Sequence, residues 1–376
     1  MNKVAQFLIR SHGLDDSFYI ASMKTLKLKI DEWKSLLPRI QPFYAIKCNP
    51  NKVIMQNMIS NGLGFDCASK TEIETVLGIG ASSKNIIFAH PVKKVSDLIY
   101  ASKNGIKYTT FDSKSELDKL KRYAPDFKCI IRLKVDNPTA RIQLGLKYGV
   151  TWDEYKGLID YAKYLNLDIV GTSFHVGSDS KDPNVFANGV DFSKVVFDYA
   201  KSKGFMNMNV LDIGGGYCKD NFKETAHVLN ASLDTHFPPH NNIKIIAEPG
   251  RYFAEETFTL CTPIIGQRYR DNVYEYWLSD GLYGSFNCIL YDYQQPKYEV
   301  VRNPLLDKYI GDNTVKKSIL NGITCDSFDT MGNALLPKIR NGDFIMCRNF
   351  GAYTIAGAMN FNGIEMSDLK TFYIED

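Results

Sequence analysis

The chain has no apolar run close to the roughly 18 residues that a membrane-spanning helix needs. It also has little excess charge of one sign: 45 Lys and Arg face 42 Asp and Glu in 376 residues, a formal net charge of +3. Charge this balanced gives no indication of a nucleic-acid-binding or membrane-surface protein. The first 16 residues hold only a short apolar stretch before charged residues, so we expect no secretory signal.

No CxxC pair occurs, although the chain has eight cysteines. Their wide spacing argues against a disulfide framework and against a zinc site, and it favours a cytoplasmic protein with reduced thiols. His236 and His240 are four residues apart, but the intervening Phe-Pro-Pro is incompatible with one helix face. We therefore predict no metal site.

Short apolar runs rich in β-branched and aromatic residues recur along the first 250 residues. Most are continuously apolar and not alternating, which is typical of parallel strands covered on both faces. The predicted strands are Pro42–Cys48, Gly64–Ser69, Ile86–His90, Tyr108–Asp112, Cys129–Lys134, Ile169–Val176, Asn209–Gly216 and Ile243–Pro249.

Polar segments with helical spacing separate these runs. Ser69 followed by Glu72 forms a capping-box pattern, and Asp112–Pro125 and Asp153–Asn166 place apolar residues three or four apart. Eight strands alternating with helices predict an α/β fold, a closed (β/α)₈ barrel of the TIM type. A doubly wound open sheet is the alternative, although eight regular repeats favour closure.

The pattern changes after about residue 254. Short runs then alternate with Gly, Asn and Asp turns, which predicts an antiparallel β domain without helices. The segment Ser17–Ile30 opens with a strand-like piece. We therefore expect residues 1–30 to join the β domain, 31–253 to form the barrel and 254–376 to complete the β domain.

Polar residues stand at the carboxyl ends of the predicted barrel strands, where active sites of such barrels form. They are Lys47, Asp66, His175, the triplet Gly214-Gly215-Gly216, Glu248 and Arg251. Each alone has an ordinary explanation as a surface lysine, a structural histidine or a tight turn. Their shared location at one end of one barrel favours a common site.

Pyridoxal 5′-phosphate needs the chemistry that this set offers. Lys47 could form a Schiff base, and burial in its apolar strand would lower the pKa of its amine. The glycines expose N–H groups to a phosphate, and Arg251 adds a guanidinium group with paired N–H donors. Glu248 could hold a ring nitrogen protonated.

Other catalytic schemes fit the sequence less well. The GGG triplet lacks the Lys-Ser/Thr of a P-loop, and neither a GxGxxG nor an HExxH motif supports a different catalytic scheme.

Eight segments resemble the ornithine decarboxylase group of pyridoxal-phosphate enzymes, which has an alanine-racemase-like barrel. In the family's order they are FYAIKCN, GFDCAS, SFHVGS, LDIGGG, AEPGRYF, DGLYGSFNCILYD, TCDSFD and GAYT, spanning about residues 42 to 354. The resemblance implies pyridoxal-phosphate-dependent decarboxylation of a basic L-amino acid, first of all L-ornithine to putrescine in polyamine biosynthesis. It also implies a homodimer whose subunits share their active sites.

The resemblance assigns a role to each matching residue. The catalytic set would be Lys47 as the covalent attachment point, His175 stacked on the ring, Glu248 at the ring nitrogen and Cys325 as the proton donor to the α-carbon. Asp66, Ser178, Gly216, Pro249, Gly250, Arg251 and Tyr353 would complete the cofactor site. Tyr291 and Asp292 of one subunit would meet Cys325 and Asp326 of the other around the substrate.

Two points leave the substrate open. Without the resemblance, Asp292 and Asp326 would be ordinary turn residues and Cys325 a small buried residue. Residues 293–296 read Tyr-Gln-Gln-Pro where the family usually has His-Ala, which bears on the length of the substrate tail. Arginine or lysine therefore remain alternative substrates, and a catalytically inactive regulatory paralogue is a remote alternative.

Overall fold

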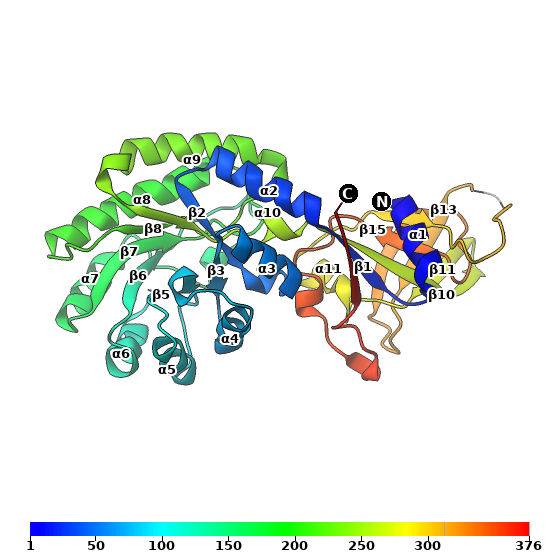
Figure 1. Ribbon diagram of the computed structural model, residues 1–376, viewed down its shortest axis with the longest axis horizontal. Helices are drawn as coiled ribbons and strands as arrows, with labels where there is room; N and C mark the ends of the chain where they lie inside the picture. The colour runs from blue at the N-terminus through cyan, green and yellow to red at the C-terminus, as the bar shows by residue number, and fades with distance from the viewer. Residues whose placement is uncertain (312, 376) are drawn as a thin grey trace. The chain divides into compact units, whose positions relative to one another are not determined.

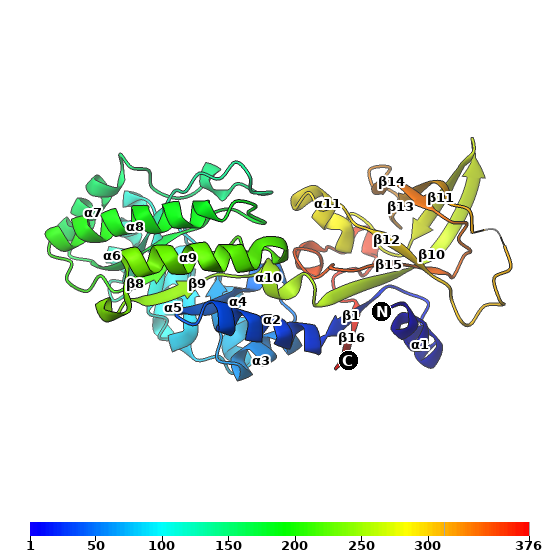
Figure 2. The same ribbon diagram turned by 90° about the horizontal axis from the view of Figure 1, so that it is seen from above.

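The computed structural model describes residues 1–311 and 313–375. The chain divides into two compact units (Figures 1 and 2). The barrel unit is Lys29–Tyr252, and the β unit combines Met1–Leu28 with Phe253–Asp376. Within the described residues, no helix combines the length and apolar character needed to cross a membrane.

Eight parallel strands close into a barrel in their sequence order, with the first strand pairing to the last. They are β2 (Ile40–Ala45), β3 (Gly64–Cys67), β4 (Ile86–Phe88), β5 (Tyr108–Phe111), β6 (Lys128–Leu133), β7 (Asp168–Phe174), β8 (Val210–Asp212) and β9 (Lys244–Ala247). Each lies within or beside one of the eight predicted runs. The predicted closed barrel is confirmed, and the open sheet is wrong.

Helices surround this barrel in Figure 1. They are α2 (Met23–Leu36), α3 (Lys52–Ser60), α4 (Lys70–Gly78), α5 (Val95–Lys103), α6 (Lys114–Tyr123), α7 (Tyr155–Tyr164), α8 (Asn184–Ser202), α9 (Phe222–His236) and the single turn α10 (Arg251–Ala254). The predicted cap of α4 is present, because Ser69 Oγ accepts a hydrogen bond from the Glu72 N–H at 3.3 Å.

Mostly branched and aromatic side chains of the barrel strands fill the barrel interior. This cluster contains Phe43, Ile87, Ala89, Ile130, Val170, Val210 and Ile246. Because the interior is packed with apolar groups, polar side chains are confined to the two ends of the barrel. The strand ends therefore carry the chemistry that the fold can offer.

The β unit is built on one eight-stranded sheet. Its strands are β1 (Phe18–Ser22), β10 (Phe258–Arg270), β11 (Val273–Leu278), β12 (Tyr298–Val301), β13 (Lys316–Asn321), β14 (Thr330–Leu336), β15 (Phe344–Cys347) and β16 (Lys370–Ile374). Most pairs are antiparallel, as predicted, but β11 pairs with β13 and β1 with β16 in parallel.

The N-terminal segment agrees with its prediction only in part. Strand β1 joins the sheet by pairing with β10 and β16, as expected. The rest of the predicted segment enters helix α2, and helix α1 (Asn2–His12) was not predicted. Helix α11 (Cys288–Tyr291) likewise contradicts the expected absence of helices after residue 254.

Candidate active site

Lys47 lies at the carboxyl end of the first barrel strand, in the short helical turn η1 (Ile46–Cys48). Its Nζ atom is 2.9 Å from Oδ2 of Asp66, which follows the buried Phe65 on the neighbouring strand β3. The predicted burial of the Lys47 amine is wrong, since its side chain is 43% exposed. Asp66 is 2% exposed and provides a fixed anionic partner, so the amine is both positioned and accessible.

The glycine triplet follows β8 and packs against two neighbouring strand ends. A Cβ atom on Gly214 would lie 1.9 Å from the Phe174 carbonyl oxygen, and one on Gly215 would lie 2.6 Å from Nε2 of His175. Any side chain there would therefore collide with the backbone or with the histidine. Within the described residues, the N–H groups of Gly215 and Gly216 have no hydrogen-bond acceptor, so both can receive an anion.

Glu248 follows β9 and shares its surroundings with Asp212 at the end of β8. Both carboxyls are buried, and burial followed by the negative charge of Asp212 raises the pKa of Glu248 well above its ordinary value. Burial likewise raises the pKa of Asp212. Oε1 of Glu248 has no hydrogen-bond partner within the described residues. A buried, unpartnered carboxyl oxygen is suited to a cationic N–H donor.

This carboxyl pair predicts a pH dependence of stability. Because both pKa values are raised on folding, the folded protein binds protons more tightly than the unfolded chain. Stability is then greatest below the ordinary carboxyl range and is lost as the pH rises through the raised values. We expect the Tm of cofactor-free protein to fall by on the order of 5 °C between about pH 5 and pH 8.

Differential scanning calorimetry across that range provides the measurement. Glu248→Gln should flatten the slope, because glutamine cannot ionise. The matched control is Glu224→Gln, at an exposed position of α9, which should retain the wild-type slope. An unchanged slope in Glu248→Gln would contradict the assignment of the titration to this pair.

His175 directly follows β7, and its Nδ1 accepts a hydrogen bond from the Gly177 N–H at 3.0 Å. Burial, and then the nearby charges of Arg132 and Lys47, hold its pKa well below the ordinary value. The ring is therefore neutral near pH 7, with its orientation set by the backbone bond. A neutral, fixed imidazole offers a flat face for stacking.

Arg251 and Ser178 meet beside the glycine loop. Nη2 of Arg251 donates to Oγ of Ser178 at 2.9 Å, and Arg251 is only 3% exposed. Gly250 precedes the arginine, and a Cβ there would lie 2.8 Å from Cβ of Cys48. The chain after β9, including Pro249, therefore passes tightly against the end of β2, which brings the arginine close to the loop containing Ser178.

These residues fit pyridoxal phosphate on three independent features. Gly215 and Gly216 form a phosphate cradle that a Cβ would fill, and Arg251 with Ser178 supplies polar groups beside it. The unpartnered Glu248 oxygen suits a protonated ring nitrogen, and the Lys47 amine is accessible for a covalent bond. Of the predicted barrel residues, the structure pairs Lys47 with Asp66 and Ser178 with Arg251.

The remaining predicted residues belong to the β unit. Cys325 is exposed, whereas the other seven cysteines are buried, so its interpretation as a buried core residue is wrong. Its N–H donates to Oδ1 of Asn362 at 3.0 Å. Asp326 accepts a hydrogen bond from the Tyr283 hydroxyl, which together with the Phe328 N–H lowers the pKa of Asp326. The loop thus presents a thiol and a charged carboxylate together.

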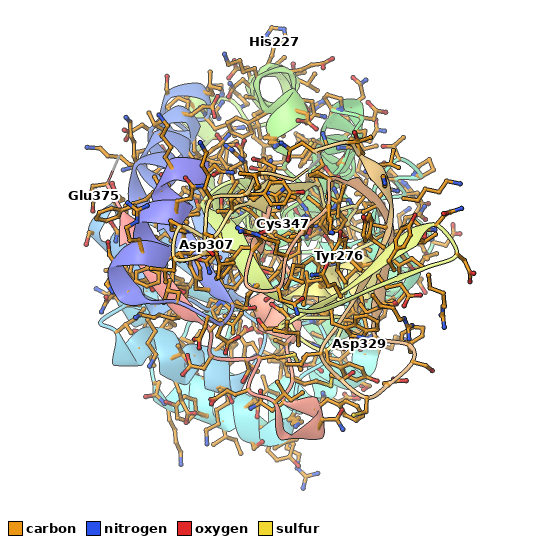
Figure 3. The ribbon with its side chains drawn as sticks, turned by 90° about the vertical axis from the view of Figure 1, so that its right-hand side faces the viewer. His227, Tyr276, Asp307, Asp329, Cys347 and Glu375 are labelled. Carbon is orange, nitrogen blue, oxygen red and sulfur yellow. The ribbon has the colours of Figure 1, made fainter. Side chains whose placement is uncertain are left out.

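Asp329, labelled in Figure 3, holds this loop in place. Its buried carboxylate accepts from the Leu282 N–H at 2.7 Å and from the Thr324 hydroxyl at 2.7 Å. It therefore ties the segment before Cys325 to the segment that carries Tyr283.

Tyr291 is 63% exposed at the end of α11, and the adjacent Asp292 is buried. Tyr353 adopts a positive φ of 57° in the loop that follows β15. These three predicted residues thus occupy two separate turns of the β unit.

The sequence reasoning assigned no role to Asp212, Tyr283 or Asp329. Asp212 stands in the LDIGGG segment itself, two residues before the glycines, so its acidity next to a strand end was an available signal. Tyr283 and Asp329 are ordinary turn residues in sequence. Only the folded chain shows that they support Asp326 and the loop around Cys325.

Comparisons with known proteins agree with this geometry. Residues 23–255 match the family described as "Pyridoxal-dependent decarboxylase, pyridoxal binding domain". An ornithine decarboxylase from Schizosaccharomyces pombe is 39% identical, with 98% of this chain and 86% of that protein covered.

Two solved structures resemble the fold closely. The Paramecium bursaria Chlorella virus arginine decarboxylase bound to agmatine has a TM-score of 0.93 and 38% identity, with both chains fully covered. The lysine/ornithine decarboxylase from Vibrio vulnificus complexed with putrescine has a TM-score of 0.88 and 27% identity, covering 99% of this chain and 98% of that one.

Proposed function

Because this chain belongs to the family of pyridoxal-dependent decarboxylases, we propose that it decarboxylates L-ornithine to putrescine and CO₂, within polyamine biosynthesis. The observation that carries the choice of substrate is the 39% identity to an ornithine decarboxylase over 98% of the chain. The acidic side chains of Asp292 and Asp326 support a cationic substrate tail, because paired carboxylates favour an ammonium and disfavour a distal carboxylate.

Each residue of the site has a proposed task. Lys47 binds the cofactor covalently, and Asp66 positions the Lys47 amine. Glu248 holds the ring nitrogen protonated, and His175 stacks on the ring. The phosphate is bound by a group of backbone and side-chain donors: Ser178, Gly216, Gly250, Arg251 and Tyr353. Pro249, which has no N–H to donate, completes the cofactor site beside Gly250. When bound, pyridoxal phosphate provides an electron sink for the electron pair left by the departing CO₂. Cys325 Sγ then gives its proton to the α-carbon.

Shared active sites in a homodimer form the second part of the proposal. Cys325 is exposed, and large side chains next to it and to Asp292 are exposed as well, with Phe328 at 61% and Tyr293 at 67%. Exposed aromatic groups of this size are typical of interfaces.

We also propose that the two compact units are the two domains of the protein. The protein works in the cytoplasm, where its unpaired cysteines would stay reduced.

Arginine is the second candidate substrate. The Chlorella virus arginine decarboxylase structure covers the whole chain at 38% identity, nearly the value of the ornithine decarboxylase. The turn after Asp292 also differs from the usual family sequence: Tyr293 has a positive φ of 51°, and Gln294 donates to the Asn349 carbonyl at 3.2 Å. This turn bears on the room available for the substrate tail.

Steady-state assays with L-ornithine, L-lysine and L-arginine test the proposal. We expect kcat/KM for ornithine to exceed the other two by at least about tenfold. One methylene allows that discrimination against lysine, and the larger guanidinium group of arginine changes the tail further. Asp326→Ala should lower kcat/KM for ornithine by about 10²-fold through loss of a charge partner. The matched control, Asp368→Ala, removes an exposed carboxylate of the same unit and should change nothing. Higher turnover of arginine would replace ornithine with the second candidate.

A further inference from the structure

Helix α1 presents a polar face beside its buried one. Ala5, Leu8 and Ile9 pack into the core of the β unit with Phe18 and Phe344. Lys3, Gln6 and Arg10 are spaced three and four residues apart, so they share a different face of the same helix. This face lines a cavity of about 750 Å³ in the β unit.

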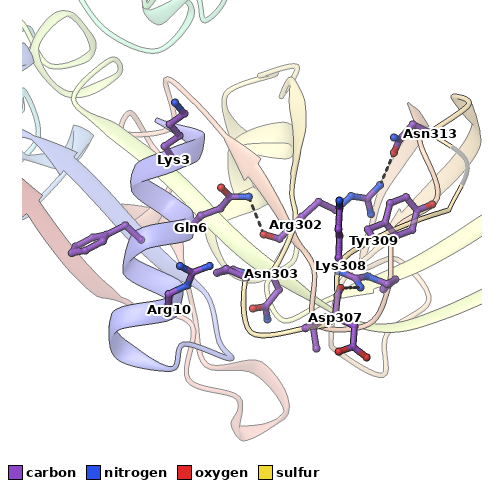
Figure 4. A pocket seen from close by; sticks show the side chains of 13 residues that line it. Lys3, Gln6, Arg10, Arg302, Asn303, Asp307, Lys308, Tyr309 and Asn313 are labelled. Atoms are coloured by element: carbon purple, nitrogen blue, oxygen red, sulfur yellow. Dashed lines mark hydrogen bonds between the residues drawn. The ribbon is translucent and has the colours of Figure 1, made fainter.

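The segment after β12 forms the opposite wall of this cavity (Figure 4). In the figure Gln6 and Arg10 project from α1 toward Arg302 and Asn303, and Gln6 Nε2 donates to the Arg302 carbonyl at 3.2 Å. Lys308 lies on the same wall. Cations from two elements far apart in the sequence therefore line one hollow.

Two arginines of this wall are fixed in position. Arg302 and Arg340 lie 3.0 and 2.9 Å from the buried carboxylate of Asp343. Both guanidinium groups also lie over the ring of Tyr309, Arg302 at 3.8 Å from its centroid. Most of their N–H donors are bonded to Asp343, to the Asn313 side chain or to the Asp307 carbonyl, so the two arginines contribute a fixed positive charge to the wall.

Three further cations that line the cavity form no ion pair with the described side chains. Lys3, Arg10 and Lys308 are exposed and form no ion pair or hydrogen bond within residues 1–311 and 313–375. Of the described side chains, five cations and Asp307 line the cavity, and Asp343 adds one negative charge behind it. These described side chains leave an excess of three positive charges at the cavity. A hollow lined by charges of one sign attracts ions of the opposite sign.

We propose that this cavity binds an oligophosphate, either a free chain of two or more phosphates or the phosphate chain of a nucleoside di- or triphosphate. A single phosphate carries about two negative charges, too few to neutralise the excess. The cations come from both walls of the cavity, and an extended anion can contact cations of both. Lys3, Arg10 and Lys308 would make charge-assisted hydrogen bonds to the phosphate oxygens. The site is independent of the proposed decarboxylation.

Isothermal titration calorimetry on protein saturated with pyridoxal phosphate tests this site, because the bound cofactor blocks the glycine cradle. We expect tripolyphosphate to bind at least tenfold more tightly than inorganic phosphate. The double variant Arg10→Gln/Lys308→Gln should weaken tripolyphosphate at least tenfold. The matched control Lys24→Gln/Lys27→Gln, exposed on α2, should stay within twofold of wild type.

Titrations with ATP, and with adenosine as the same nucleoside without phosphates, distinguish the two sources of the phosphate chain. Tighter binding of ATP than of tripolyphosphate would identify a nucleotide site, and equal binding a site for the phosphate chain alone. The proposal is overturned if tripolyphosphate binds no more tightly than phosphate, or if Arg10→Gln/Lys308→Gln binds it as wild type does. Neither residue lies in the proposed catalytic site, so failure here leaves the decarboxylase proposal intact.

Discussion

Lys47→Ala should leave the cofactor-treated protein without the absorbance near about 420 nm that marks a lysine-bound pyridoxal group. Decarboxylation should fall by at least about 10³-fold, because the covalent attachment and the positioned amine are lost together. The Lys47 amine is accessible and is held by Asp66 at 2.9 Å. Alanine removes this amine without disturbing the packed interior, since the side chain lies outside the barrel core.

Borohydride reduction followed by peptide mass spectrometry identifies the modified lysine directly. Lys52→Ala is the matched control: it removes an exposed lysine at the start of α3, five residues further along, and should keep both colour and activity. A cofactor adduct on any other lysine would refute the role of Lys47. A wild-type protein that never takes up the cofactor would instead support the inactive regulatory paralogue.

The barrel could be predicted because its signals are local. Most strands are continuous apolar runs, and the segments between them have helical spacing, so eight regular repeats favour a closed barrel over an open sheet. Once the barrel is assigned, the carboxyl ends of the strands indicate where polar groups gather. Lys47 and Asp66 were therefore predicted at one site, and the structure places them in contact.

The environment of these groups could not be predicted in the same way. The exposure of Lys47 depends on where β2 ends, and the strand stops at Ala45, two residues before the lysine. The contact between Asp212 and Glu248 depends on the register of β8 against β9, which pairs Asp212 with Ile246. One residue of slippage would turn either carboxyl to the other face.

Contacts between residues far apart in the sequence could not be predicted either. Asp329 bonds to Leu282, 47 residues earlier, and nothing in the local sequence distinguishes it from a turn aspartate. Helix α1 was missed although five of its 11 residues are apolar, because this short stretch was considered only as a possible secretory signal. Tertiary packing on β1 and β15 stabilises it, rather than helix propensity alone.

Mixing two inactive variants should restore activity if the sites are shared. Lys47→Ala removes the cofactor attachment, and Cys325→Ala removes the proposed proton donor, which should lower putrescine formation by about 10²-fold. In a twofold-symmetric dimer, each heterodimer contains one site with both defects and one with neither. Random exchange makes half of the dimers heterodimers, so the mixture should reach about a quarter of wild-type activity.

The control for this experiment is the double variant Lys47→Ala/Cys325→Ala mixed with wild type. Its heterodimers hold one defect in each site, so they should be inactive and the mixture should lose activity as exchange proceeds. Native mass spectrometry of tagged subunits measures the exchange independently. If Lys47 and Cys325 of one chain served the same site, the two single variants would restore nothing after complete exchange. The exposed position of Cys325, the only exposed thiol among eight, argues for the shared arrangement, because a proton donor needs a covered site and its own surroundings leave it open.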